Sequence, residues 1–129
     1  MQNFQKRVLW PLLAFLALIT AGAAVAQQPP SEEPPANVAG KWTIYSKGGD
    51  GKTATQYIDL VQDGVKITGH FKGPHQSGGL EGTMNGRHIV FKTKTREVLT
   101  FRGMVDGNTI EGTFGIRGVQ GEWQARRPD

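Results

Sequence analysis

A turn dipeptide recurs three times along this chain at nearly constant spacing, and the repeat restricts the fold more than any other feature. Asp63-Gly64, Asn85-Gly86 and Asp106-Gly107 lie 22 and 21 residues apart. Such pairs favour two-residue type I′ turns, in which both central residues have positive φ and the flanking strands are antiparallel. Each pair therefore predicts a β-hairpin, and three hairpins in succession predict a meander.

The residues around these turns repeat as well, which indicates the face of the sheet that is buried. Five residues before each Asp or Asn stand Ile58, Leu80 and Phe101, and four residues after it stand Ile67, Ile89 and Ile110. Side chains alternate between the two faces of a strand, and residues opposed in a hairpin share a face. The residues predicted to point inward are Trp42, Ile44, Ile58, Leu60, Val65, Ile67, Phe71, Leu80, Met84, Ile89, Phe91, Leu99, Phe101, Val105, Ile110, Phe114 and Trp123.

From Val38 onward, glycine and proline recur too often for a helix, while β-branched and aromatic residues alternate with polar ones. Adding one strand at each end of the three hairpins predicts eight strands. They span residues 40–47, 53–62, 65–72, 79–84, 87–95, 98–105, 108–114 and 119–127. One open sheet of this length would expose its apolar face, whereas closure buries that face and removes the edges. The sequence therefore predicts, over residues 38–129, a single all-β domain that is an eight-stranded antiparallel up-and-down barrel.

The first 26 residues have the three parts of an export signal. Lys6 and Arg7 form a positive start, an apolar stretch follows, and Ala24-Val25-Ala26 offers the small residues that a signal peptidase requires. We expect cleavage after Ala26 and a periplasmic or secreted protein. The alternative is an uncleaved membrane anchor, because residues 8–26 could just span a bilayer. The chain has no cysteine, which excludes disulfides, lipid attachment and cysteine-bound metals.

Residues 27–37 read QQPPSEEPPAN, and their four prolines cannot sustain a helix or a strand ladder. We expect a disordered tether, and the other interpretation is a stiff segment presented to a partner. The formal charge of +4, from 15 Lys and Arg against 11 Asp and Glu, falls to +2 when the two cations of the signal leave. So small an excess of positive charge on an exported chain excludes nucleic acid as a partner.

The first predicted strand begins Gly40-Lys41-Trp42-Thr43, which resembles the G-x-W entry of the calycins, the lipocalin, fatty-acid-binding and avidin barrels. The wider pattern is similar to small secreted bacterial barrel domains of unknown function, found alone or appended to hydrolases. The resemblance implies that Trp42 closes one barrel end beneath an arginine, Arg127 or else Arg126. The barrel-end residues that it implies are Gly40, Trp42, Trp123 and Arg127. Ile44 stands where avidin has a biotin-binding asparagine, so biotin is not an expected ligand.

Residues able to catalyse a reaction or bind a metal occur without the spacing that either function requires. His70, His75 and His88 form no H-x-x-x-H pair and have no paired carboxylates beside them. We therefore expect solvent-exposed histidines, with neither a metal nor a cofactor. The serines that follow the signal lie outside any G-x-S-x-G frame. These observations predict a protein that is not an enzyme.

Four glycines occupy the inward phase, where a valine or isoleucine would pack well. They are Gly69, Gly82, Gly103 and Gly112. One interpretation is that glycine lets a small barrel coil tightly. The other is that the missing side chains leave room for a small apolar ligand. The ligand-binding residues expected for the second interpretation are Met84, Phe91, Phe101, Gly103 and Phe114.

Lys92, Lys94 and Arg96 alternate along one predicted strand and its turn, and so share a face. This basic stripe either meets an anionic envelope surface or keeps the strand soluble. Together these features predict an exported, non-catalytic barrel that binds a small apolar ligand or a secreted or envelope protein. The alternative is a protein-interaction or hydrolase-inhibitor domain that acts through its loops and the tether.

Overall fold

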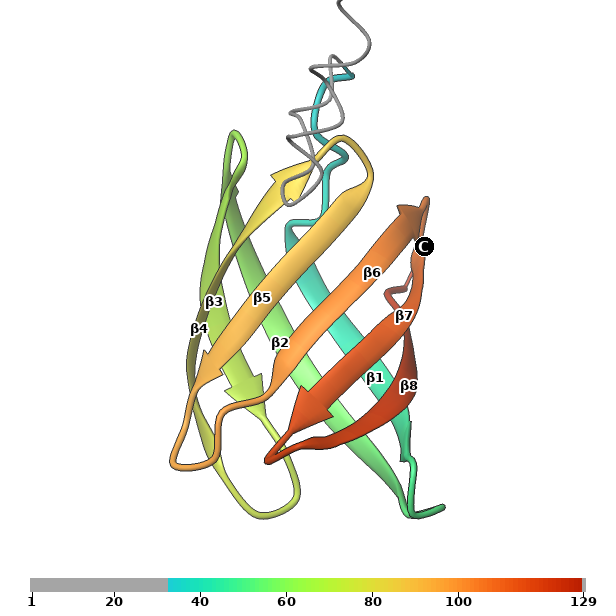
Figure 1. The fold of residues 1–129 in the computed structure, drawn as a ribbon. Helices are drawn as coiled ribbons and strands as arrows, with labels where there is room; N and C mark the ends of the chain where they lie inside the picture. The colour runs from blue at the N-terminus through green and yellow to red at the C-terminus, as the bar shows by residue number, and fades with distance from the viewer. Residues whose placement is uncertain (1–32, 129) are drawn as a thin grey trace, which may run out of the picture. The chain divides into compact units, whose positions relative to one another are not determined.

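The computed structural model describes residues 33–128, which form a closed barrel of eight antiparallel strands (Figure 1). The strands are β1 (Gly40–Gly48), β2 (Thr53–Asp63), β3 (Lys66–Lys72), β4 (Ser77–Asn85), β5 (His88–Lys94), β6 (Thr100–Asp106), β7 (Thr109–Ile116) and β8 (Val119–Arg126). Each strand pairs with its neighbours in sequence, and β8 closes the barrel on β1. The predicted all-β up-and-down barrel is therefore confirmed.

The expected signal, residues 1–26, and the first part of the tether, residues 27–32, lie outside the described residues. In the part of the chain that is described, no helix has the length and apolar character needed to cross a membrane. The export of the protein stays a prediction from its sequence.

The turns between β2 and β3, β4 and β5, and β6 and β7 are two-residue turns, but each is centred one residue later than predicted. Asp63 pairs with Lys66, so Gly64 and Val65 form the first of these loops. In each loop the glycine has a positive φ, 61–63°, and the residue after it does not. This is the pattern of a type II′ turn rather than the expected type I′. A type I′ pattern occurs instead between β7 and β8, where Arg117 and Gly118 have φ of 50° and 78°.

The displaced turn explains why the inward prediction for Val65 is wrong. Gln62 pairs with Ile67, whereas a turn centred on Asp63 and Gly64 would have paired Gln62 with Val65. The register therefore moves by two residues, which leaves every strand residue on its predicted face because side chains alternate with a period of two. Val65 itself becomes a turn residue and is 54% exposed.

The other residues predicted to point inward form the core. Val38 and Ala125, which the prediction omitted, are buried with them, as are the polar side chains of Ser46, Gln56 and Thr93. Five aromatic rings fill the middle of the barrel. The Phe91 and Phe101 rings stack with centroids 4.7 Å apart, and Trp123 meets Phe101 edge-on at 5.1 Å. Phe71 and Phe114 extend this cluster, with ring centroids 6.3 and 5.8 Å from that of Phe101.

The inward glycines lie where neighbouring strands approach each other most closely. A Cβ atom on Gly82 would overlap the carbonyl oxygen of Val90, and one on Gly112 would overlap that of Arg102. A Cβ atom on Gly103 would come within 2.9 Å of the Trp123 ring. Backbone and packed rings already occupy the space around these glycines. The geometry thus favours the interpretation that they permit tight coiling over the interpretation that they line a pocket.

One end of the barrel, the closed end, is sealed by an arginine stacked on a tryptophan. The Arg127 guanidinium carbon lies 4.6 Å from the centroid of the Trp42 ring. Arg127 Nε donates to Asn108 Oδ1 at 2.9 Å, and Nη2 donates to the Asn37 carbonyl at 2.9 Å. The Trp42 indole N–H donates to the Val38 carbonyl at 2.9 Å. The arginine that the calycin resemblance implied is therefore Arg127.

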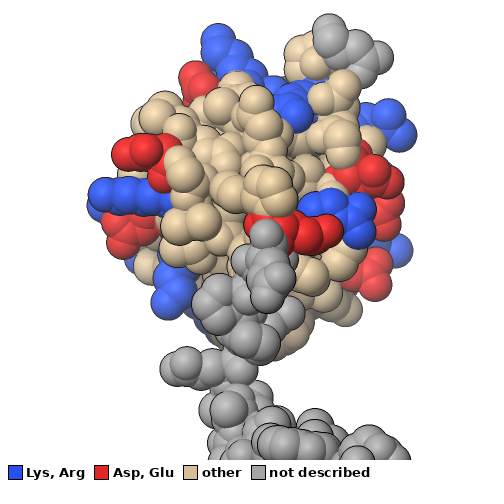
Figure 2. All heavy atoms as spheres, turned by 90° about the horizontal axis from the view of Figure 1, so that it is seen from above, with Lys and Arg blue, Asp and Glu red and all other residues tan. Residues whose placement is uncertain are grey.

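The end of the predicted tether takes part in this seal. The Ala36 N–H donates to the Gly86 carbonyl, and the Gln62 amide donates to the Ala36 carbonyl at 2.8 Å. Gln62 Oε1 also accepts a hydrogen bond from the Val38 N–H at 2.7 Å. The last residues of the expected tether, 36 and 37, therefore contact the barrel. Viewed from this end, charged side chains lie mostly around the periphery, and the middle of the face is mainly uncharged (Figure 2).

We predict that Gly112→Ala lowers the free energy of unfolding by about 3 kcal/mol, because the added Cβ forces β7 away from β6. Gly115→Ala is the matched control on the same strand. Its Cβ would make an ordinary contact, 3.8 Å from the Val119 carbonyl, so this variant should be as stable as the parent or up to about 1 kcal/mol more stable. Urea denaturation measures both effects, and equal stabilities would contradict the close-approach explanation.

We predict that Arg127→Lys lowers the free energy of unfolding by about 1–2 kcal/mol, because lysine lacks the planar fork that bonds Asn108 and Asn37 while covering Trp42. The exposed neighbour Arg126 provides the control, since Arg126→Lys retains the charge and changes no contact at the closed end. Thermal unfolding followed by tryptophan fluorescence compares the two. A similar effect of both substitutions would count against the seal.

Candidate functional site

The barrel end opposite Trp42 is open and contains a cavity. The loops there join β1 to β2, β3 to β4, β5 to β6 and β7 to β8 (Figure 1). The cavity has a volume of about 230 Å³ and is bounded by the first three of these loops and by the ends of β7 and β8. Its apolar lining comes from Ala54, Phe71, Leu99, Phe114 and Ile116. Exposed residues of the loops also border it, so the cavity communicates with solvent at this end.

Two polar side chains of β1 and β2 face the interior beside this apolar lining. Ser46 and Gln56 both line the cavity and are only 7% and 6% exposed. Strand pairing places Gln56 opposite Ile44 and Ser46 opposite Ala54, so the two polar residues are diagonal neighbours on the inner face. The Ser46 hydroxyl donates to the Ala54 carbonyl at a long distance of 3.4 Å.

Gln56 is the unusual member of this pair. Its Oε1 atom is inaccessible to solvent and accepts no hydrogen bond from any residue in the described part of the chain. Buried acceptors are almost always paired, and leaving one unpaired costs about 1–3 kcal/mol. Gln56 therefore lines the cavity as a residue, while its Oε1 atom is shielded from it and has no partner in the described residues.

The cavity mouth is held by a set of hydrogen bonds between two loops. The Gln76 amide donates to the Glu97 carbonyl at 2.7 Å and accepts from the Glu97 N–H at 3.0 Å. Thr95 Oγ1 donates to the same carbonyl, and the Glu97 carboxylate pairs with Arg117 at 2.8 Å. These contacts tie the β3–β4, β5–β6 and β7–β8 loops together. These loops are therefore joined to one another in the structure without a ligand.

The structure places the five predicted ligand-binding residues in different parts of the barrel. Phe114 lines the cavity. Phe91 and Phe101 are fully buried in the aromatic cluster, and Gly103 lies against Trp123. Met84 is toward the closed end, where its N–H donates to the Val65 carbonyl of the β2–β3 turn. Of these residues, therefore, Phe114 alone lies in the lining of the open-end cavity.

The predicted barrel-end residues are also divided. Gly40, with a φ of 118°, begins β1 beside Trp42 and Arg127 at the closed end. Trp123 lies apart from them, in the aromatic cluster, and its indole N–H donates to the carbonyls of Arg102 and Thr113 at 3.0 and 2.9 Å. The implied grouping of Trp123 with the closed end is thus corrected.

The predicted basic stripe does not form one surface. Lys94 Nζ lies 3.0 Å from Glu81 Oε1, and Glu81 stands directly opposite Lys92 on the neighbouring strand. Arg96 belongs to the β5–β6 loop and borders the cavity mouth. One carboxylate therefore offsets much of the charge of the two lysines, and the third cation faces a different part of the molecule.

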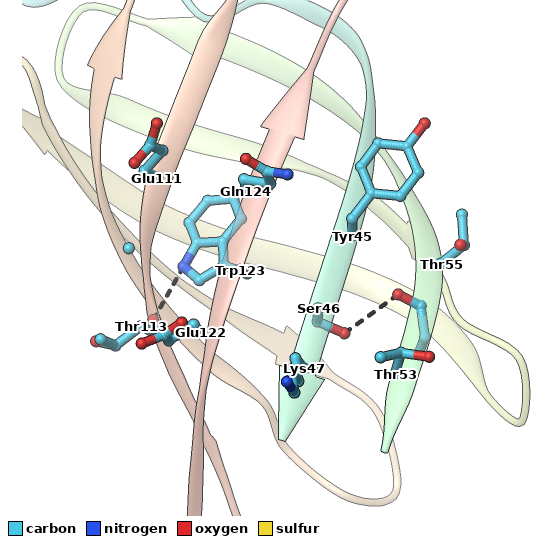
Figure 3. Close-up of a pocket in the computed structure, with 12 residues that line it drawn as sticks. Tyr45, Ser46, Lys47, Thr53, Thr55, Glu111, Thr113, Glu122, Trp123 and Gln124 are labelled. Atoms are coloured by element: carbon cyan, nitrogen blue, oxygen red, sulfur yellow. Dashed lines mark hydrogen bonds between the residues drawn. The ribbon is translucent and has the colours of Figure 1, made fainter. Parts of the chain in front are cut away.

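The outer surface is hollowed across β7, β8, β1 and β2, as Figure 3 shows. This groove has a volume of about 960 Å³. The outward-facing residues that line it are Tyr45, Lys47, Thr53, Thr55, Glu111, Thr113, Glu122 and Gln124. These eight are exposed to solvent, so water can satisfy their polar atoms, while Ser46, Ala54, Gly112 and Trp123 lie beneath them. The groove is larger and more polar in its lining than the open-end cavity, whose walls are mainly apolar.

Gln56 was absent from the predicted ligand-binding residues, because only apolar residues and glycine were considered for the inner face. Gln56 shares the phase of Ile58 and Leu60 on the same strand, so a polar residue in an inward position was the available signal. Within residues 33–128, no group of three or more His, Asp or Glu residues is arranged to bind a metal ion.

A scan against protein-family models finds no match, and a search of curated proteins finds none. Among solved structures, a redesigned β-barrel gives a TM-score of 0.67 at 12% identity, over 77% of this chain and 99% of that chain. A Schistosoma mansoni fatty acid binding protein in complex with arachidonic acid gives 0.46 at 15% identity, over 70% and 96%. At these identities the likeness concerns the fold alone, and the narrower resemblance to secreted bacterial domains stays a prediction.

We predict that Gln56→Leu raises the free energy of unfolding by about 1–2 kcal/mol, because it replaces an unpaired buried acceptor with an apolar group of similar size. Gln62→Leu is the matched control, because the Gln62 amide bonds Ala36, Val38 and Gly64 and its loss should be destabilising. Urea denaturation of both variants tests the difference. A loss of stability in Gln56→Leu equal to that of the control would show that Oε1 is paired in solution.

Proposed function

We propose that this protein binds a small, mainly apolar molecule in the cavity at the open end of its barrel. The observation that supports the proposal most directly is a cavity whose inner walls are apolar side chains, with two buried polar residues, Ser46 and Gln56, beside them. Ligand sites in proteins combine mostly apolar walls with a few polar groups that orient the ligand. A barrel of eight strands has room for side chains or for one small ligand. In this barrel aromatic side chains fill the middle, and the cavity lies at the open end.

The size of the cavity limits the ligand. A dry cavity of about 150 Å³ accommodates a benzene ring, and the cavity here has a volume of about 230 Å³. Sites for drug-sized molecules are larger, about 300–1,000 Å³. One substituted aromatic ring or a short alkyl chain therefore fits, and a long acyl chain would extend out of the mouth.

The two ends of the barrel give the ligand one route. The stack of Arg127 on Trp42 and the segment 36–39 cover the closed end, and the aromatic cluster fills the middle. Entry is through the open end, between loops that the Gln76–Glu97 contacts already fix. Because the mouth is preorganised, binding requires little ordering of the chain, which favours affinity.

We assign binding rather than catalysis to this cavity. Its buried polar groups are an amide and a hydroxyl, which offer hydrogen bonds but do not exchange protons near neutral pH. The titratable residues of the lining belong to the loops, where Asp50, Lys52, His75 and Arg96 are exposed and Glu97 is partly buried. With the predicted signal of residues 1–26, the proposal is a binding protein of the periplasm or the extracellular medium.

The alternative is an interaction domain that presents its tether and loops to one protein partner. Residues 36–39 are attached at the closed end, whereas the longer loops surround the open end. The two elements therefore lie at opposite ends of the barrel and do not form one continuous surface. This separation favours the cavity as the site of function.

We predict that toluene binds the protein saturably and that Ala54→Leu abolishes the binding, because the larger side chain occupies the cavity from the inner face of β2. Thr55→Leu adds the same side chain on the outer face of the same strand and should leave binding unchanged. Chemical-shift changes in ¹H–¹⁵N spectra, titrated with toluene, measure both. Shifts that persist in Ala54→Leu, or that map to the outer groove, would overturn the proposed site.

A further inference from the structure

The net positive charge of the barrel belongs to one half of its wall. Among residues 33–128, thirteen Lys and Arg stand against nine Asp and Glu. Residues 66–106 contain seven of these cations and three of these acids, whereas the rest of the described chain contains six of each. Residues 66–106 form β3, β4, β5 and β6, which are neighbours in the barrel (Figure 1). One continuous half of the wall therefore holds the whole excess of positive charge.

The cations of these four strands project outward, because side chains alternate between the two faces of a strand. The exposed cations on the outer face are Lys66, Lys72, Lys92, Lys94 and Arg102. β4 lies between β3 and β5 and has one charged side chain, Glu81. The outer surface of β3–β6, named here the basic face, thus extends well beyond the predicted stripe on β5.

Carboxylates neutralise little of this charge. Lys94 Nζ lies 3.0 Å from Glu81 Oε1, but the two side chains are 61% and 63% exposed, and ion pairs between exposed side chains are weak. The other four cations of the basic face form no ion pair within residues 33–128. For Lys72 and Arg102, moreover, the residues directly opposite on both neighbouring strands are uncharged. These side chains are available to an anionic partner.

The basic face offers charge without aromatic side chains. Phe71, Phe91 and Phe101 point inward, and the outer faces of β3–β6 carry no Phe, Tyr or Trp. Proteins that bind single-stranded nucleic acid stack its bases on aromatic side chains, and the exposed tyrosines of this barrel, Tyr45 and Tyr57, belong to β1 and β2. The basic face is therefore suited to phosphate groups rather than to rings.

An anionic bilayer matches this arrangement. Its headgroups form a two-dimensional array of phosphates, and each Lys or Arg near such a surface adds to the attraction. Cations that are spread over three strands can meet several headgroups at once, which one small anion cannot do. The same half of the barrel exposes two apolar side chains, Val98 by 49% and Met104 by 42%, and apolar groups gain free energy from burial at the boundary between headgroups and acyl chains.

We infer that the basic face docks on membrane surfaces that contain anionic phospholipid. The inference goes beyond the proposed function, since it concerns the outside of β3–β6 and does not involve the cavity. The attraction is electrostatic and acts between exposed charges, so salt screens it and the docking is reversible. For a chain that is exported, as its first 26 residues predict, such docking would keep the protein at a membrane surface.

Co-sedimentation with sucrose-loaded vesicles tests this inference. The protein used is residues 27–129, because the apolar stretch before Ala26 would itself enter a bilayer. We expect binding to vesicles of phosphatidylcholine mixed with phosphatidylglycerol, and none to vesicles of phosphatidylcholine alone. Raising the salt concentration from about 0.1 M to about 1 M shortens the Debye length from about 10 Å to about 3 Å and should release the protein.

Two double variants of equal net charge test the position of the contact. The first, Lys72→Gln with Arg102→Gln, removes two cations from the basic face. The control, Lys47→Gln with Arg126→Gln, removes two exposed cations from β1 and β8. One cation near an anionic surface strengthens binding about fivefold, so the first variant should bind the mixed vesicles about 5-fold to 25-fold more weakly. The control should bind them as wild type does.

The outcomes that would overturn the inference are distinct. Absence of binding to the mixed vesicles at about 0.1 M salt, or equal binding to neutral vesicles, would refute it without any variant. Equal losses in the two double variants would show that attraction follows the net charge rather than the basic face. Retention on immobilised heparin without binding to vesicles would assign the face to a polyanion instead of a membrane.

The cavity provides the last control. Ala54→Leu, which fills the cavity, should bind the mixed vesicles as wild type does, because Ala54 lies on the inner side of the wall. Loss of vesicle binding in this variant would contradict docking through the basic face and indicate that lipid enters the cavity. Toluene binding tests the proposed function separately, so either proposal can fail while the other holds.

Discussion

The close approach of neighbouring strands at the inward glycines is the constraint on which the rest of this structure depends. A barrel of eight strands has an interior little wider than two layers of side chains. Gly82 and Gly112 let the backbone of one strand lie against the next, and the aromatic cluster packs into the narrowed centre. If side chains occupied these positions, the strands would separate and the rings would lose their contacts.

This narrowing also determines where an open space can exist. With Phe91, Phe101 and Trp123 filling the middle, the interior is divided into a sealed end and an accessible one. The sealed end is covered by the Arg127–Trp42 stack and by residues 36–39, whose backbone groups find partners on the β2–β3 and β4–β5 hairpins. The accessible end has longer loops, and the cavity of about 230 Å³ lies among them.

The inner walls of the cavity are mostly apolar, which limits the kinds of ligand that it can bind. Apolar side chains from several strands form its walls, and Gln56 contributes the amide whose oxygen has no partner in residues 33–128. The loops that surround it are joined by Gln76 and Glu97, so the shape of the mouth does not depend on a ligand. The volume of the cavity restricts an occupant to a small molecule, and the outer groove across β7, β8, β1 and β2 is a separate, more polar feature (Figure 3).

The sequence by itself determined the eight strands, their order and the face that each side chain occupies, because period-two alternation and turn dipeptides are local properties of the chain. It also identified Trp42 and Arg127 through the calycin resemblance. The centre of each turn was decided by the pairing of the two strands across the hairpin. In the first hairpin this pairing makes Val65 a turn residue and exposes it. The role of the inward glycines and the position of the cavity required the tertiary structure, since both depend on distances between strands remote in sequence. Gln56 illustrates the same limit: its phase was visible in the chain, but only the assembled barrel shows that its oxygen is buried and unpaired.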